Sequence, residues 1–328
     1  MSLGMRVISR SQHSARLGVT LAASAARHIL DVDDLSADEL KSILDLAERD
    51  DLPSVLKGKG VALLFEKPSA RTRQASEMAV VDLGGHPITI RGEEVGIPHR
   101  ETAEDVARTL ACYHRLIGAR VFDHATLVGM VQALNGAGVG VPVVNLLSDV
   151  AHPCQTLADL LTIRQCLGGL AGATLAYVGD ANNVCHSLVL GACMSGMRVR
   201  VASPAGYSLS AEDRLRVVGL GGQLEILTDP MAAVDGADAV YTDVWTSMGQ
   251  ESSAAARRVC FDGFKVDDRM MSGAAPDAIF LHCLPAHRGE EVSASVLDGP
   301  QSAVWQQAAN RRSTTRALFY WLIAGART

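Results

Sequence analysis

Short apolar segments alternate with helical patterns along almost the whole chain, and this alternation limits the folds that it can adopt. Up to residue 150, strand-like runs begin near residues 60, 86, 116 and 141, and each is followed by a helical pattern. After residue 170 the alternation resumes, with runs near 174, 198, 223, 238 and 277. Strands that alternate with helices of this length form parallel sheets. The sequence therefore predicts an α/β protein with two doubly wound, Rossmann-like parallel-sheet domains.

The helical segments indicate how the two domains are joined. We expect residues 27–150, together with 305–328, to form one domain and residues 151–304 to form the other. A helical pattern at 155–168 falls at the boundary, and the last helix is long enough to return to the first domain. The first 30 residues contain four arginines and no acid. This composition is typical of a transit peptide, but a tag remnant followed by an extension fits residues 1–26 better.

Composition excludes several classes of function. The net charge of −6 and the lack of a long basic run argue against a nucleic-acid partner. No apolar run approaches the roughly 20 residues that span a bilayer, and residues 317–325 are expected to form a buried helix. The seven cysteines include no C-x-x-C pair and lie mostly in apolar segments, which predicts reduced core cysteines. These features favour the cytoplasm over the mitochondrial matrix.

The segment FEKPSARTR, residues 65–73, places hydroxyl groups and arginines between a predicted strand and a predicted helix. The first N–H groups of a helix attract anions, and the guanidinium group matches phosphate oxygens. The alternative is an ordinary capped helix start with solvated arginines. The segment therefore indicates an anion site, with phosphate as the anion that fits best.

Two further polar segments lie near the ends of strands. In HPCQ, His152 can polarise a carbonyl oxygen with Gln155 beside it, or the two residues can form a capping turn. Asn182 and Asn183 follow the strand at 174–180, where an amide can hold a carboxylate or an amine, or can form a turn. Position alone leaves both alternatives open.

The last two polar segments lie further along the chain. In DVWTSMGQE, Asp243 and Ser247 make a loop suited to an ammonium group, or the start of a helix. In HCLPAH, the residues His282, Cys283 and His287 have no distant partner pair, so zinc is not expected. The Leu284–Pro285 step predicts a strained or cis turn.

A nucleotide cofactor is not expected either. Gly179 follows a strand and precedes a helix, as the first glycine of a dinucleotide site does. However, the other glycines of G-x-G-x-x-G are absent, and the next strand ends without an acid that would bind a ribose. This argues against a nicotinamide-dependent dehydrogenase.

In order and spacing, these segments resemble the ornithine carbamoyltransferases from about Arg27 to Arg327. FEKPSARTR is similar to the family's F-E-K-x-S-T-R-T-R, DVWTSMGQE to D-x-x-x-S-M-G and HCLPAHRGEEV to H-C-L-P, while HPCQTLADLLTI, VGDANNVCHSL and QQAANRR match three further family segments. The resemblance implies transfer of the carbamoyl group from carbamoyl phosphate to the side-chain amine of L-ornithine. The products would be L-citrulline and phosphate, in arginine biosynthesis. It also implies a homotrimer with active sites at subunit boundaries, with no cofactor, metal or membrane partner.

The resemblance assigns roles to residues by position. Arg120 and His152 would polarise the carbamoyl carbonyl group, and Cys283 or Asp243 would assist the loss of the amine proton. The residues implied for carbamoyl phosphate are Ser69, Ala70, Arg71, Thr72, Arg120, His152, Gln155, Cys283, Leu284 and Arg311. Those implied for ornithine are Asn183, Asp243, Ser247 and Met248.

Two positions depart from the family pattern. Ala70 stands where the family usually has threonine, which predicts weaker phosphate binding. Gly96 occupies the place of a glutamine, for which His99 or Arg100 would compensate across a subunit boundary. The alternatives are a carbamoyltransferase for aspartate, putrescine or N-acetylornithine, and a non-catalytic homologue that binds carbamoyl phosphate.

Overall fold

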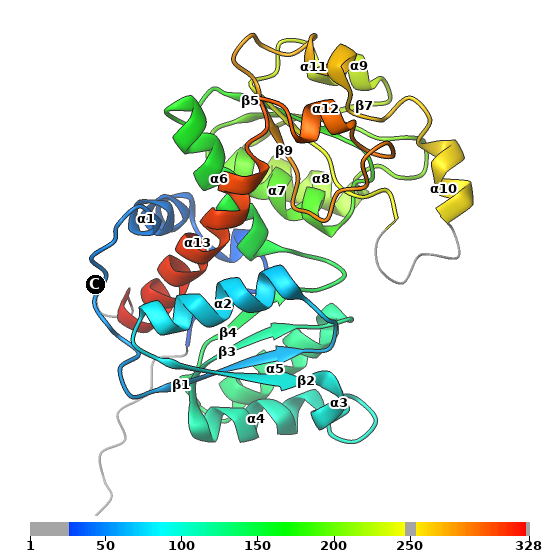
Figure 1. The fold of residues 1–328 in the computed structure, drawn as a ribbon. Coiled ribbons are helices and arrows are strands. Elements are labelled where there is room, and N and C mark those ends of the chain that lie inside the picture. Colours follow the sequence, from blue (N-terminus) through cyan, green and yellow to red (C-terminus); the bar gives the residue numbers. More distant parts are fainter. Residues whose placement is uncertain (1–25, 247–253, 326–328) are drawn as a thin grey trace, which may run out of the picture.

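A computed structural model describes residues 26–246 and 254–325, and it contains two parallel sheets (Figure 1). The first has the order β2-β1-β3-β4, formed by β1 (Gly60–Phe65), β2 (His86–Arg91), β3 (His114–Arg120) and β4 (Val143–Leu147). The second has the order β7-β6-β5-β8-β9, formed by β5 (Thr174–Val178), β6 (Arg198–Ala202), β7 (Gln223–Leu227), β8 (Ala239–Tyr241) and β9 (Ile279–Leu281). The predicted fold class is confirmed.

Helices cover both faces of each sheet. Along β1, Val61 and Leu63 pack toward α2 and α13, whereas Ala62 and Leu64 pack toward α4 and α5. Because side chains of a strand alternate between faces, a strand buried on both sides reads as a continuous apolar run. The longer helices are α1 (Ala37–Ala47), α2 (Ala70–Asp82), α4 (Ala103–Tyr113), α5 (His124–Gly136), α6 (Pro153–Leu167), α7 (Asn183–Met194), α8 (Ala211–Gly219) and α13 (Val304–Ala324).

The helices α6 and α13 join the two halves of the molecule. α13 begins beside β9 and runs back to lie along α2 and α1, while α6 lies against β4, α7 and α13 (Figure 1). Residues from both sheets, including Leu146 and Tyr177, share one apolar core with Leu160 of α6 and Phe319 of α13. The bridging helices and the returning last helix are therefore confirmed.

The helix α2 begins at Ala70, inside the segment FEKPSARTR. Ser69 is its N-cap, and the Ser69 hydroxyl accepts a hydrogen bond from the Thr72 N–H at 3.3 Å. A serine cap supplies an acceptor for the otherwise free N–H groups of the first turn. As a result Arg71 and Thr72 lie in that first turn, at the carboxyl end of β1.

The structure also contains short helices, most of which span too few residues to show a helical period in the sequence. They are η1 (Val32–Asp34), α3 (Gly92–Val95), α9 (Pro230–Val234), α10 (Ala254–Cys260), α11 (Asp268–Met271) and α12 (Ala294–Leu297). No helix of the described residues is both long and apolar enough to cross a bilayer. The proposed extension at 1–26 lies outside the described residues except for its last position.

The prediction that most cysteines lie in the core is wrong. Only Cys154, Cys185 and Cys193 are buried, and Cys283 is partly buried. The other three, Cys112, Cys166 and Cys260, are exposed. These three lie in the last turns of α4, α6 and α10, beside apolar residues such as Tyr113 and Val259 that are themselves exposed. All seven cysteines are free thiols.

Candidate active site

A cavity of about 1010 Å³ lies between the two halves of the molecule, and the ends of six strands contribute to it. Parallel strands bring their carboxyl ends to the same edge of a sheet, which is why segments distant in sequence meet there. Of the residues predicted from the sequence, those that line the cavity are Ser69, Ala70, Arg71, Thr72, Arg120, His152, Gln155, Asn183, Asp243, Cys283, Leu284 and Arg311. Ser247 and Met248 lie outside the described residues.

Two buried guanidinium groups converge on one hydroxyl group. Arg120 Nη1 lies 3.3 Å and Arg311 Nη2 lies 3.2 Å from Thr72 Oγ1, and both arginines are over 90% buried. Within the described part of the chain neither is paired with a carboxylate, and both Nε atoms lack hydrogen-bond partners. Burial, followed by the charges of Arg311 and Arg71, lowers the pKa of Arg120 to about 10. This uncompensated positive charge would be offset by a bound anion.

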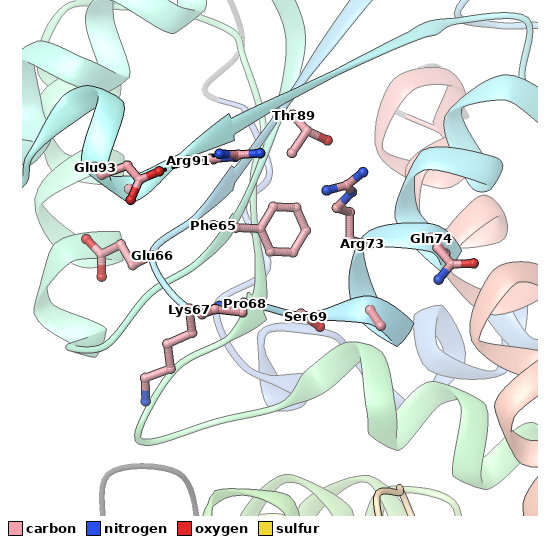
Figure 2. A pocket seen from close by; sticks show the side chains of 12 residues that line it. Phe65, Glu66, Lys67, Pro68, Ser69, Arg73, Gln74, Thr89, Arg91 and Glu93 are labelled. Atoms are coloured by element: carbon pink, nitrogen blue, oxygen red, sulfur yellow. Dashed lines mark ion pairs between the residues drawn. The ribbon is translucent and has the colours of Figure 1, made fainter.

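A second hollow, of about 640 Å³, adjoins the cavity where β1 and β2 end (Figure 2). Arg73 and Arg91 lie on one side of the Phe65 ring, and Lys67 extends away on the other. Here the charges are compensated, because Arg73 pairs with Glu77 at 3.1 Å and Arg91 with Glu93 at 3.6 Å. The larger cavity is therefore the better anion site.

His152 is buried at the start of α6, on the wall next to the two arginines. Burial, followed by the charges of Arg311 and Arg120, holds its pKa well below the usual range, so the imidazole is neutral. Its Nδ1 has no hydrogen-bond partner among the described residues, and its backbone N–H donates to Ser187 Oγ at 2.9 Å. A neutral imidazole has one donor nitrogen and one acceptor nitrogen. The side chain can therefore donate a hydrogen bond to a carbonyl oxygen in the cavity.

Both ends of the Gln155 side-chain amide are hydrogen-bonded to other protein groups. Its Nε2 donates to Asp159 Oδ1 at 2.7 Å, and its Oε1 accepts a hydrogen bond from Arg311. The amide therefore turns its oxygen, not its nitrogen, toward the cationic part of the cavity. Asp159 is absent from the sequence-based prediction.

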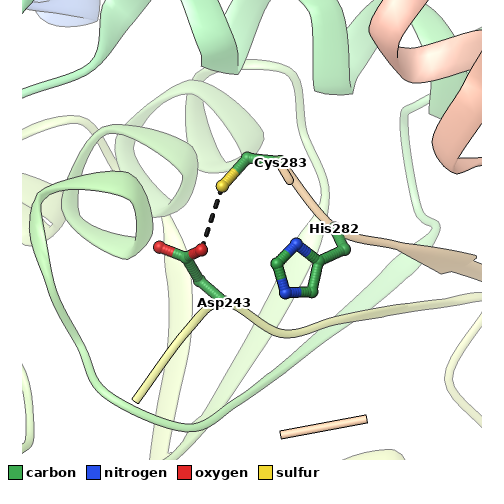
Figure 3. Close-up of side chains that lie close together, drawn as sticks. All are labelled: Asp243, His282 and Cys283. Atoms are coloured by element: carbon green, nitrogen blue, oxygen red, sulfur yellow. Dashed lines mark hydrogen bonds between the residues drawn. The ribbon is translucent and has the colours of Figure 1, made fainter. Parts of the chain in front are cut away.

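The opposite wall of the cavity carries negative charge. Asp243 follows β8, and its Oδ2 accepts a hydrogen bond from Asn182 Nδ2 at 2.7 Å. Its Oδ1 faces Cys283 Sγ at 3.0 Å, as Figure 3 shows. Burial, followed by the charge of Asp243, raises the pKa of the Cys283 thiol well above its usual range. The thiol therefore stays protonated and donates to the carboxylate.

The two asparagines after β5 have different roles. Asn182 reaches Asp243, whereas Asn183 Nδ2 donates to the backbone oxygen of Ser148 at 2.6 Å, in the loop after β4. Asn183 thus ties the two halves of the cavity wall together. Only Asn183 is assigned to ornithine by the family resemblance, so the contact of Asn182 with Asp243 is an addition from the structure.

Asp243, His282 and Cys283 bring possible metal-ligand atoms within 4.8 Å of one another. These atoms already have other partners. His282 Nδ1 accepts the Leu284 N–H at 2.9 Å, and its Nε2 lies 3.2 Å from Glu291 Oε1. Since both ring nitrogens are occupied, the group does not fit a metal ion. The Leu284–Pro285 peptide bond is cis, one of the two forms that the sequence suggests.

A partly buried ion pair also lines the cavity. Arg257 Nη1 lies 2.6 Å from Asp180 Oδ2 and donates to the backbone oxygen of Trp245 at 2.8 Å. Sequence reasoning missed this pair because its members are 77 residues apart. The position of Asp180 at the end of a strand was the only signal for it.

Gly96 and Arg100 lie away from the cavity lining. Gly96 has a φ of 67°, and a Cβ atom there would lie 2.9 Å from Arg100 Cβ. A glutamine at this position would therefore be strained. Arg100 Nη1 donates to the backbone oxygen of Glu94 at 3.0 Å.

Two family models match the chain. The carbamoyl-P binding domain of aspartate/ornithine carbamoyltransferase matches residues 27–165, and the Asp/Orn binding domain matches residues 171–322. An ornithine carbamoyltransferase from Acidothermus cellulolyticus is 48% identical over 92% of this chain and 97% of the relative. The solved ornithine carbamoyltransferase from Pyrococcus furiosus has a TM-score of 0.85 and 41% identity, over 93% of this chain and 99% of that one. The solved ornithine carbamoyltransferase from Thermus thermophilus has a TM-score of 0.82 and 42% identity, over 92% of this chain and 100% of that one.

Proposed function

The chain belongs to the aspartate/ornithine carbamoyltransferase family, and we propose that it transfers the carbamoyl group of carbamoyl phosphate to L-ornithine. The products are L-citrulline and phosphate, and the reaction belongs to arginine biosynthesis. One observation carries the proposal: a single cavity combines two buried guanidinium groups, which pair with no carboxylate of the described residues, with a carboxylate–thiol pair on the facing wall. The first fits an acyl phosphate and the second an amine.

The cationic wall suits carbamoyl phosphate. The phosphate would lie at the start of α2, against Ser69, Ala70, Arg71 and Thr72. Arg120 and the neutral His152 would polarise the carbamoyl carbonyl group, with Gln155, Cys283, Leu284 and Arg311 completing the site. Fixed cationic groups stabilise the negative charge that develops on the carbonyl oxygen and on the departing phosphate.

The acidic wall suits ornithine. Asp243 would bind an ammonium group, with Asn183, Ser247 and Met248 as its proposed neighbours. The attacking amine must be neutral, because an ammonium group has no free electron pair. Its nitrogen forms a bond to the carbamoyl carbon while the bond from that carbon to the phosphate oxygen breaks. Since the Cys283 thiol is protonated, Asp243 is the better of the two candidates for accepting the amine proton.

The ion pairs on this wall favour ornithine over aspartate. A second substrate carboxylate would need a free basic group, yet Arg257 pairs with Asp180 at 2.6 Å and Arg258 with Glu290 at 2.7 Å. Putrescine and N-acetylornithine are the alternative amines. A non-catalytic homologue is the alternative that lies outside enzymes. The presence of Arg71, His152, Asp243 and Cys283 in the cavity lining argues against it.

We also propose a cytoplasmic homotrimer with active sites at subunit boundaries. Support comes from β2, an edge strand whose Ile88 is 38% exposed, in a sheet type that is usually covered. Seven free thiols suit a reducing compartment. The carbamoyl-phosphate domain would comprise residues 27–150 and 305–328, and the ornithine domain residues 151–304.

Stoichiometry tests the proposal. Purified protein is given carbamoyl phosphate and ornithine, and the phosphate and the ureido product are measured in the same samples. We expect one ureido group for each phosphate above the spontaneous background. Phosphate release without a ureido product would indicate hydrolysis, and the absence of both would favour a binding protein.

A further inference from the structure

Asp159 is a fully buried carboxyl group beneath the active site. It lies on α6, one turn after Gln155, and its Oδ1 accepts hydrogen bonds from two side-chain amides. These are Gln155 Nε2 at 2.7 Å and Gln307 Nε2, from α13, at 2.6 Å. Burial raises the pKa of Asp159 to about 7. The carboxyl group thus links the two helices that bridge the domains.

These two hydrogen bonds, together with the one that Arg311 donates to Gln155, determine which end of each amide faces the active site. A glutamine amide has a donor end and an acceptor end. With its nitrogen held by Asp159, Gln155 must turn its oxygen toward Arg311 and the cavity. Gln307 turns its oxygen toward the backbone of His282, and this oxygen accepts a hydrogen bond from the His282 N–H at 3.0 Å. His282 immediately precedes Cys283.

We propose that Asp159 is a positioning residue that orients Gln155 to accept a hydrogen bond from the substrate's NH₂ group. Through Gln307 it also holds the backbone that carries Cys283. The inference rests on the proposed function, because it assumes that carbamoyl phosphate is the anion in the cavity. It deepens that function by adding Asp159, which does not line the cavity, as the residue that orients the Gln155 amide toward the carbamoyl nitrogen.

The orientation has a consequence for specificity. Acetyl phosphate has nearly the same shape as carbamoyl phosphate, but it has a methyl group in place of the NH₂ group. The amide oxygen of Gln155 can accept a hydrogen bond from the NH₂ group of carbamoyl phosphate, but it cannot form one with the methyl group of acetyl phosphate. If the amide were free to rotate, its own NH₂ group could face the substrate's, donor against donor, and the preference would fall.

The experiment compares variants by the ratio of the acetyl phosphate inhibition constant to the carbamoyl phosphate KM. A ratio does not change when part of a preparation is unfolded. Asp159→Leu removes both acceptors, and we expect its ratio to fall roughly tenfold. Asp159→Asn retains an oxygen that can accept from both glutamines, so its ratio should stay near the native value.

Thr162→Val is the matched control in the same helix pair. Thr162 is fully buried, and its Oγ1 accepts a hydrogen bond from Asn310 Nδ2 at 2.8 Å, away from the cavity. We expect this variant to lower the Tm and to leave the ratio unchanged. If Asp159→Leu does not fold, Asp159→Ala takes its place.

Two results would overturn the inference. The first is an Asp159→Leu variant that loses stability yet keeps the native ratio, like Thr162→Val, which would make Asp159 merely structural. The second is a ratio that falls as far in Asp159→Asn as in Asp159→Leu. That result would show that the charge of Asp159, and not the orientation of the amide, sets the ratio. If the native protein fails to carbamoylate ornithine, the proposed function fails separately. In that case, calorimetry measures the dissociation constants of acetyl phosphate and carbamoyl phosphate, and their ratio is compared among the same variants.

Discussion

At the scale of single residues, Thr72 shows how the cationic half of the site is organised. Its hydroxyl oxygen accepts from Arg120 and Arg311, two like charges that no carboxylate of the described chain separates. Like charges held together in a buried site destabilise each other. A bound anion would therefore reduce the repulsion between the two guanidinium groups, as expected for a phosphate-binding site.

A substitution at Ala70 tests the placement of the phosphate. Ala70 is the first residue of α2 and lines the cavity. Ala70→Thr adds a hydroxyl group where the family usually has one. One additional hydrogen bond of about 1 kcal/mol should lower the carbamoyl phosphate KM roughly fivefold. Steady-state kinetics at saturating ornithine measure this change.

The control at the same position is Ala70→Val, which has the shape of threonine without its hydroxyl group. It should leave the KM near the native value or raise it. If the threonine and valine variants had equal KM values, the phosphate would not lie at the start of α2.

At the scale of secondary-structure elements, α7 and α8 are fastened to the N-terminal segment by a buried charged cluster. His186 of α7 lies 2.7 Å from Asp31 Oδ2 and 2.6 Å from Asp213 Oδ1. The hydrogen bonds and charges of these carboxylates outweigh burial and raise the pKa of His186 to about 9. Ser187 donates to Asp31 and accepts the His152 N–H, so this cluster also supports the active site.

This cluster predicts a loss of stability at alkaline pH. A folded-state pKa above the unfolded value of 6.5 means that the stabilisation is complete below pH 6.5 and is lost as pH rises toward 9. The loss should amount to roughly 3 kcal/mol in the free energy of unfolding. Urea unfolding at several pH values between 6 and 9.5 measures it. His186→Gln should be less stable at pH 6 and should show a much flatter profile, whereas an unchanged slope would assign the effect to other groups.

The sequence predicted the strands well because each one is an apolar run that ends in polar residues. It also placed Ser69, His152, Asp243 and Cys283 at the ends of strands, from which the fold brings them together. The pairings between distant segments could not be predicted. Asp159 and Gln307 are 148 residues apart, and each looks like an ordinary helical residue within its own segment. Only the packing of α6 against α13 makes them partners.

At the scale of the whole molecule, α6 and α13 make the two halves share one core. The cavity lies between these halves, so carbamoyl phosphate and ornithine can approach from facing walls. Arg311 is carried on α13 beside the cationic wall. Its side chain therefore depends on the same helix that returns to the first domain.

Arg100 tests whether neighbouring subunits share active sites. Within one chain it lies outside the cavity lining and contacts the backbone of Glu94. Arg100→Ala should nevertheless raise the carbamoyl phosphate KM if the residue reaches a neighbouring site in the proposed trimer. Light scattering confirms that the variant keeps the mass of the native assembly. An unchanged KM would show that Arg100 does not compensate for Gly96.

The most direct test of the whole account is a competition among amines. Carbamoyl phosphate is supplied with equal amounts of ornithine, N-acetylornithine, putrescine and aspartate, and the ureido products are quantified by mass spectrometry. The account predicts citrulline as the dominant product, because the acidic wall binds an ammonium group and its arginines are paired. A dominant product from any other amine would contradict the assignment of the acidic wall to ornithine.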